Sequence, residues 1–80
     1  TVKLANLLLD SNDLEAAEPL IGRLIESGDS ASSLRVRARY AHLQGDPGRA
    51  AELMESLQST FIDDWTEADA DALVRYLDDA

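Results

Sequence analysis

The chain has 80 residues, enough for one small domain, and its 16 acidic side chains against 7 basic ones give a formal net charge of −9. It contains no cysteine, which excludes disulfides, zinc–thiolate sites and thiol nucleophiles. No apolar run is longer than that of residues 7–9, whereas a membrane span needs roughly 18 residues, and no secretory signal opens the chain, so we expect a cytoplasmic location. Residues 61–80 carry seven acids against Arg75 alone, a net charge of −6 that disfavours nucleic acid or an anionic membrane as the partner.

Apolar spacing predicts two helices in the first part of the chain. Residues 2–9 are apolar around most of a helical circumference, which predicts burial on more than one side. Asp13 is suited to be the N-cap of a second helix, and Pro19 predicts a bend in that helix without a break. The apolar residues of the second helix at helical spacing are Leu14, Ala17, Leu20, Ile21 and Leu24.

Glycine-containing turns predict where the next two helices begin. Gly28 is suited to a left-handed cap, and Asp29 or Ser30 can cap a third helix over about residues 31–44. Residues 45–47 then supply glycine for a positive φ, aspartate for a cap and proline for the first helical position. A fourth helix therefore begins at residue 47.

The last quarter of the chain predicts a fifth helix. Thr66 with Asp69 three residues later is a variant of the capping box, and Trp65 just before it is expected to bury its ring under this helix. The expected apolar stripe of the fifth helix is Ala70, Leu73, Val74 and Leu77. Five helices without strand-like alternation predict an all-α fold.

An internal repeat links the two halves of this pattern. A shift of 34 residues gives as many identities as a shift of 33, but only the shift of 33 superposes the two capping aspartates. The pairs aligned at 33 are Ala5/Ala38, Asp13/Asp46, Ala17/Ala50, Leu20/Leu53 and Leu24/Leu57. Small alanines at equivalent places permit the close helix approach that stacked helical hairpins require.

These residues resemble the tetratricopeptide repeat, a helix–turn–helix of about 34 residues with small residues at fixed positions. The residues that fit its pattern are Leu4, Ala5, Leu8, Ala17 and Ile21 in the first unit and Ala38, Ala41, Gly45, Asp46, Ala50 and Met54 in the second. The chain departs from the pattern in lacking the initial Trp and the Pro between units, and in having Arg37 in place of the usual Leu.

The resemblance implies a right-handed superhelical array of stacked antiparallel hairpins. It divides the single domain, residues 1–80, into repeat one (1–29), repeat two (30–62) and an acidic capping helix (63–80). A capping helix covers the apolar face of the helix before it and presents a polar outer side.

No constellation for catalysis or for metal binding is present in the sequence. His42 is the only histidine and has no suitable partner nearby in the sequence. The acidic cluster at residues 63–71 lacks the turn glycine of an EF-hand, so it is expected to be a solvated cap. We therefore expect no enzymatic activity, no cofactor and no metal.

The resemblance also implies a concave groove lined by the first helix of each hairpin. The groove positions carried over in this way are Lys3, Asn6, Asp10, Ser32, Arg35, Arg39 and His42. The basic strip on the third helix suits an acidic peptide or a C-terminal carboxylate, or else these arginines pair with acids of neighbouring helices. The carboxylate clamp of some family members is only half matched, because Asn6 is present but Val36 stands where a second Asn is needed.

The sequence therefore favours a protein–protein interaction module that binds a peptide or partner domain in its groove. The alternative is an internal structural or oligomerisation segment of a larger multidomain protein that could itself be an enzyme. Because the helix at residues 2–9 has no preceding hairpin to cover it, self-association through this helix is also expected.

Overall fold

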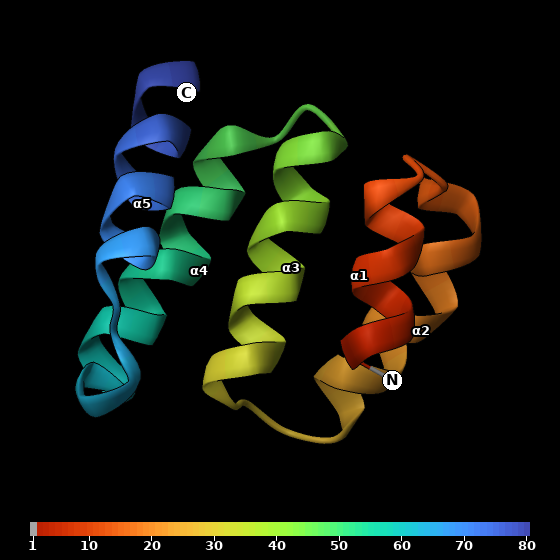
Figure 1. Cartoon of the computed structure of the whole chain (residues 1–80), viewed down its shortest axis with the longest axis horizontal. Coiled ribbons are helices and arrows are strands. Elements are labelled where there is room, and N and C mark those ends of the chain that lie inside the picture. Colours follow the sequence, from red (N-terminus) through yellow and green to blue (C-terminus); the bar gives the residue numbers. More distant parts are fainter. Residues whose placement is uncertain (1) are drawn as a thin grey trace.

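The computed structural model describes residues 2–80, which form five α-helices and no strand (Figure 1). The helices are α1 (Val2–Asp10), α2 (Leu14–Glu26), α3 (Ala31–Leu43), α4 (Pro47–Thr60) and α5 (Glu67–Asp79), with a short 3-10 turn, η1 (Ile62–Asp64), before α5. The all-α prediction and its five helices are confirmed.

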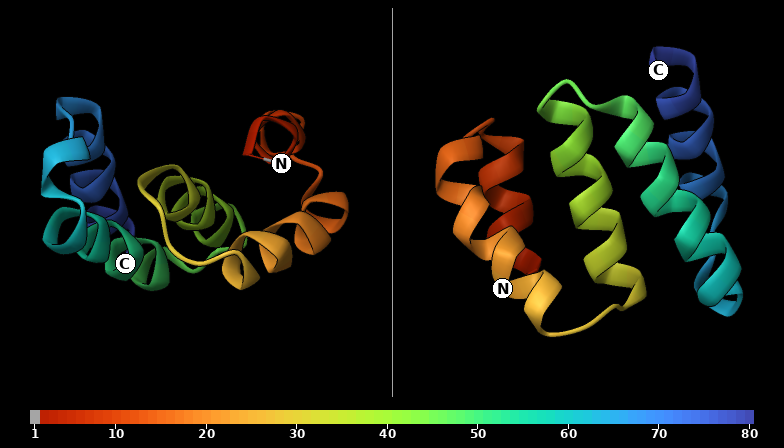
Figure 2. Two further views of the ribbon diagram at one scale, coloured as in Figure 1. Left: turned by 90° about the horizontal axis from the view of Figure 1, so that it is seen from below. Right: turned by 180° about the vertical axis from the view of Figure 1, so that it is seen from behind.

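The helices pack as adjacent antiparallel pairs in an arch. α1 pairs with α2 and α3 with α4, while α3 also packs against the first pair and α5 packs against α4. Seen along the arch, α1, α3 and α5 lie on its inner side and α2 and α4 on its outer side (Figure 2). This is the arrangement of a tetratricopeptide-like helical array, as the sequence predicted.

Side-chain caps fix the helix starts where the sequence placed them. Asp13 and Asp46 accept hydrogen bonds from backbone N–H groups of the first turns of α2 and α4. Ser30, and not Asp29, caps α3. Thr66 and the residue three positions later form a reciprocal capping box at α5. These caps satisfy N–H groups that the helices themselves leave free.

The turns inside the two hairpins have the same hydrogen bonds at a shift of 33 residues. In the first turn the N–H of Asn12 donates to Leu9 O and that of Asp13 to Leu8 O, at 3.0 and 2.8 Å. In the second turn residues 45 and 46 donate to the equivalent carbonyls at 3.0 and 2.9 Å. Asn12 and Gly45 occupy the same left-handed position, with φ of 58° and 87°. The backbone thus supports the shift of 33 over that of 34.

Pro19 does not interrupt α2, which runs continuously from Leu14 to Glu26. Proline at this depth removes one backbone hydrogen bond because it has no N–H to donate to the carbonyl four residues earlier. The helix nevertheless keeps its buried face through Ala17, Ile21 and Leu24.

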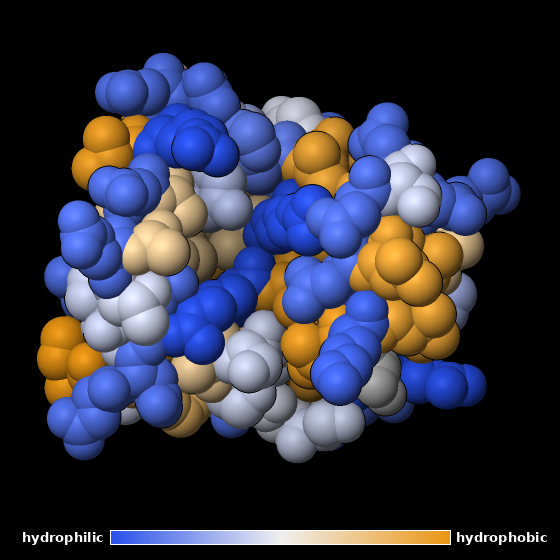
Figure 3. All heavy atoms as spheres, in the orientation of Figure 1, coloured by the Kyte–Doolittle hydropathy of each residue, from blue (hydrophilic) through white to orange (hydrophobic). Residues whose placement is uncertain are grey.

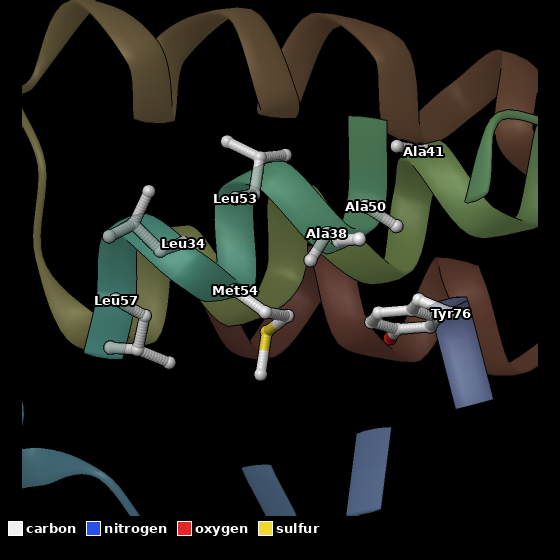
Figure 4. Packing of buried hydrophobic residues seen from close by; sticks show 9 residues of the cluster. Leu34, Ala38, Ala41, Ala50, Leu53, Met54, Leu57 and Tyr76 are labelled. Atoms are coloured by element: carbon white, nitrogen blue, oxygen red, sulfur yellow. The ribbon is translucent and has the colours of Figure 1, made fainter. Parts of the chain in front are cut away.

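Small residues lie where the helices approach most closely. Ala5, Ala17, Ala38 and Ala50 are completely buried, and Ala38 and Ala50 face each other where α3 meets α4 (Figure 4). Leu24, Leu53 and Leu57 are also buried, as the repeat pattern predicted, but Leu20 is only partly buried at the edge of its cluster.

Two hydrophobic clusters divide the core between them. One joins α1 and α2 to Val36 and Tyr40 of α3. The other joins the opposite face of α3 to α4 and α5, and Trp65 is partly buried against it. Trp65 is thus not an exposed anchor, but its ring is only partly buried. Among the described helices, α3 contributes to both clusters.

The expected apolar stripe of α5 is only partly correct. Val74 and Leu77 are exposed to 59 and 52%, whereas Asp69 and Tyr76 are buried and Leu73 is partly buried. The helix is rotated relative to the prediction because its inner face carries an aspartate that pairs with α3, a contact that hydropathy does not reveal. The outer side of α5 is therefore less polar than a capping helix was expected to be.

Candidate partner-binding groove

A groove lies on the inner side of the arch, between α1, α3 and α5. It encloses a cavity of about 270 Å³. The residues that line it are Val2, Asn6, Ser32, Arg35, Val36, Arg39, Met54, Asp69, Ala72 and Tyr76. The space-filling view of this face shows a hollow crossed by hydrophilic side chains, with a hydrophobic patch over α1 beside it (Figure 3).

Four of the seven groove positions expected from the sequence line this cavity: Asn6, Ser32, Arg35 and Arg39. Lys3 and Asp10 are exposed on α1 and lie outside the lining. His42 is near the C-terminal end of α3, half-buried against Tyr76 of α5. The structure thus brings together the central positions and leaves Lys3, Asp10 and His42 at the periphery.

Arg35 is held by α5 and by the segment before it. Its Nε and one terminal nitrogen donate to the two carboxylate oxygens of Asp69, each at 2.9 Å, in a bidentate pair. A terminal nitrogen also donates to the carbonyl oxygen of Asp64. The side chain of Asp69 is 7% exposed and that of Arg35 34% exposed, so the carboxylate is largely shielded from water while the guanidinium is partly solvated.

The contact between Arg35 and Asp69 shifts the pKa values of both groups. Burial alone would raise the pKa of Asp69, but hydrogen bonds from Arg35 and from Thr66 outweigh it and lower the pKa below its ordinary value. The hydrogen bond to Asp69 in turn raises the pKa of Arg35. Both groups are therefore charged at neutral pH, and the pair ties α5 to α3.

The other basic side chains of α3 are also paired. Arg39 donates to Asp10 of α1, and their side chains are 38 and 62% exposed. His42 Nε2 lies 2.6 Å from Asp79 Oδ2, and its ring centroid is 4.9 Å from that of Tyr76. Outside the groove, Arg37 pairs with Asp29 at 2.7 Å.

The groove therefore has little net positive charge of its own. Each of Arg35, Arg39 and His42 has an aspartate within its reach, on α5, α1 and α5 respectively. Of the two alternatives that the sequence left open for these arginines, pairing with acids of neighbouring helices is present in the structure.

Sequence reasoning missed the contribution of α5 to the groove. Asp69, Ala72 and Tyr76 follow one another at spacings of three and four, which places them on one helical face. This spacing is visible in the sequence, but the neighbouring stripe that contains Leu73, Val74 and Leu77 is more apolar, so hydropathy favours that stripe as the buried face of α5. Val36 and Met54, which form the apolar floor, were also missed.

The described residues show neither a group of side chains that could hold a metal nor a helix that could cross a membrane. Within residues 2–80, no three His, Asp or Glu side chains are grouped so that they could hold a metal ion. None of the helices that the structure describes is both long and apolar enough to cross a membrane.

Comparison with known families assigns the repeat. Residues 31–56, which cover most of α3 and α4, match the family model described as tetratricopeptide repeat. The α3–α4 hairpin is therefore similar to a tetratricopeptide repeat. This repeat is characteristic of protein-interaction modules and is typically non-catalytic. No curated protein and no solved structure matches the chain significantly.

Proposed function

We propose that the concave face formed by α1, α3 and α5 binds a segment of a partner protein and performs no reaction on it. The observation that carries this proposal is the cavity on the inner side of the arch, which combines an apolar floor with the polar groups of Asn6, Ser32 and Arg39. In this proposal residues 1–29 and 30–62 are the two repeats, and residues 63–80 both cap the array and form the third wall of the groove.

Arg39 is the groove cation that a partner reaches most easily. Its own partner, Asp10, is 62% exposed, whereas the partner of Arg35 is 7% exposed and held by a second set of hydrogen bonds. An acidic peptide or a C-terminal carboxylate would displace Asp10 from Arg39 at little cost, because exposed ion pairs contribute only about 0–1 kcal/mol. The same partner would not free Arg35.

Charge reversal at Arg39 tests the proposal. Short random peptides displayed on phage are selected against the wild-type chain, and the binding of selected peptides is measured for Arg39→Glu. We expect this variant to lose binding while its helix content by circular dichroism is unchanged. Arg49→Glu is the matched control, because Arg49 is an exposed arginine on the outer helix α4. Equal binding by wild type and Arg39→Glu would argue against a contact between the partner and Arg39.

A second candidate function is that of an internal structural or oligomerisation segment. It is favoured by apolar side chains exposed at both ends of the arch. Leu4 and Leu7 of α1 are 49 and 61% exposed, and Val74 and Leu77 of α5 are similarly exposed. Such faces are buried between neighbours in helical arrays. Sedimentation of the wild-type chain over a range of concentrations distinguishes this candidate, which requires association, from a monomeric peptide-binding module.

A further inference from the structure

We propose that the cavity between α1, α3 and α5 is an anchor pocket for one bulky apolar side chain, such as Leu, Ile or Met, of the partner segment. This inference rests on the proposed function and names what the groove recognises. It differs from the sequence-based expectation, in which the basic strip of α3 recognises acidic groups.

The floor of the pocket is apolar and buried. Val36 of α3 and Met54 of α4 are each 2% exposed and lie at its base. Met54 reaches the pocket because its side chain points from α4 toward α5, beside the ring of Tyr76 (Figure 4). Ala72 has only a methyl group on the wall that faces them, so space remains above the floor.

The pocket is smaller than most sites for drug-sized ligands. A volume of about 270 Å³ is below the range of 300–1,000 Å³ typical of sites for drug-sized ligands. The rim supplies Asn6 and Ser32, whose amide and hydroxyl can hydrogen-bond to the main chain of the segment that carries the anchor.

The charges around the pocket favour an uncharged occupant. Arg39 remains available to an acidic group elsewhere on the partner segment, because its own partner, Asp10, is exposed. Arg35 is paired with the buried Asp69, so a charged side chain that enters the pocket beside it would meet no unpaired charge of opposite sign. It would also lose its hydration, which is costly for an ion without a partner. An apolar side chain has no such cost and gains from leaving water.

The pair of Arg35 with Asp69 positions the pocket wall. Asp69 lies about one helical turn before Ala72 on the same face of α5, so the bidentate contact fixes the distance between α3 and this wall. In this view Arg35 is a positioning residue of the pocket and does not itself contact the partner through its charge.

The experiment uses peptides selected on the wild-type chain and a single spectroscopic probe in the protein. Met54 is the only methionine, so a chain labelled at the methionine methyl group gives one methyl signal, located at the pocket floor. Ala72→Leu fills the pocket. Ala70→Leu is the matched control, because it makes the same change on the same helix at a residue that does not line the cavity.

The expected result has three parts. Selected peptides share one bulky apolar position, and replacing that residue by Ala weakens binding about tenfold or more. Their binding shifts the Met54 signal. Ala72→Leu loses binding and Ala70→Leu keeps it. If Ala72→Leu does not fold, Ser32→Trp blocks the same pocket from an exposed position on its rim.

Other outcomes separate this inference from the proposed function. One outcome would overturn the anchor pocket. In it, the selected peptides share only acidic residues or a free carboxyl terminus, they do not shift the Met54 signal, and they bind Ala72→Leu as tightly as wild type. If those peptides are lost on Arg39→Glu, the concave face still binds a partner. Peptides that bind Arg39→Glu, Ala72→Leu and Ser32→Trp as well as wild type would overturn both proposals.

Discussion

Asp69 is the single side chain on which the placement of α5 most depends. It closes the capping box of α5 through Thr66 and forms the bidentate pair with Arg35 of α3. One carboxylate thus fixes both the start of the helix and its position against the array. Buried acids are rare unless they are paired, and this acid is paired twice.

We predict that Asp69→Asn destabilises the chain and alters its response to acid. Loss of charged hydrogen bonds should lower the free energy of unfolding by about 1.5–3 kcal/mol at neutral pH. Because folding lowers the pKa of Asp69, its contribution is present above the ordinary pKa of 3.8 and is lost as the pH falls below that value. Urea unfolding from neutral pH to about pH 2 should show a shallower acid decline for Asp69→Asn than for wild type. Parallel curves for the two proteins would contradict the role of the pair.

Unlike Asp69, Ser33 is a buried polar residue whose side chain has no hydrogen-bond partner among the described residues. It is 2% exposed. A buried hydroxyl without a partner costs about 1–3 kcal/mol, so we predict that Ser33→Ala raises the melting temperature. Ser32→Ala, on the exposed neighbour, should leave it unchanged. A drop in the melting temperature of Ser33→Ala would show that this hydroxyl has a partner.

At the scale of the helices, close approach depends on alanine. Ala38 is completely buried where α3 meets α4, so a larger side chain there must displace the facing helix. We predict that Ala38→Leu lowers the free energy of unfolding by about 1–3 kcal/mol. The control is Ala16→Leu on the exposed side of α2, which should be close to neutral. Thermal unfolding of both variants checks the prediction, and equal melting temperatures would count against this packing.

The helix starts and the repeat shift could be predicted from the sequence because their causes are local. A cap such as Asp46 acts on an N–H three residues away, and Gly45 adopts its positive φ within the turn itself. The sequence also indicated which alanines are buried, since equivalent positions recur at the shift of 33.

The rotation of α5 and the state of the groove charges could not be predicted in the same way. The partners of Arg35 and Arg39 are 34 and 29 residues away, so their pairing depends on how the helices are placed and not on neighbouring residues. Hydropathy favoured Val74 and Leu77 as inner residues of α5, but the pairing of Asp69 decided the orientation. Long-range polar contacts were thus the information that the sequence pattern lacked.

At the scale of the whole molecule, the exposed side chains of α1 predict association. Leu4 and Leu7 of α1 are 49 and 61% exposed, and no helix within the described residues covers them. The space-filling view shows a hydrophobic patch over α1 (Figure 3). We predict that the wild-type chain self-associates at high concentration and that Leu4→Gln with Leu7→Gln reduces this. Sedimentation of the wild-type chain and of this double variant over a range of concentrations measures the association. The pair Val74→Gln and Leu77→Gln reports whether α5 contributes instead, and a wild-type chain that stays monomeric at every concentration would contradict the prediction.

The division of the core into two clusters that share α3 has a consequence for how the molecule opens. The cluster of α1 and α2 is the smaller, and α3 is the helix that it shares with the other cluster. Opening free energies differ among the cooperative units of a protein, and arrays of hairpins can open one unit at a time. Amide hydrogens of α1 and α2 should therefore exchange with deuterium before those in the middle of α3 and α4. A partner segment that spans α1 and α5 would slow this exchange in α1, so protection of its amides would report binding even when the overall shape does not change.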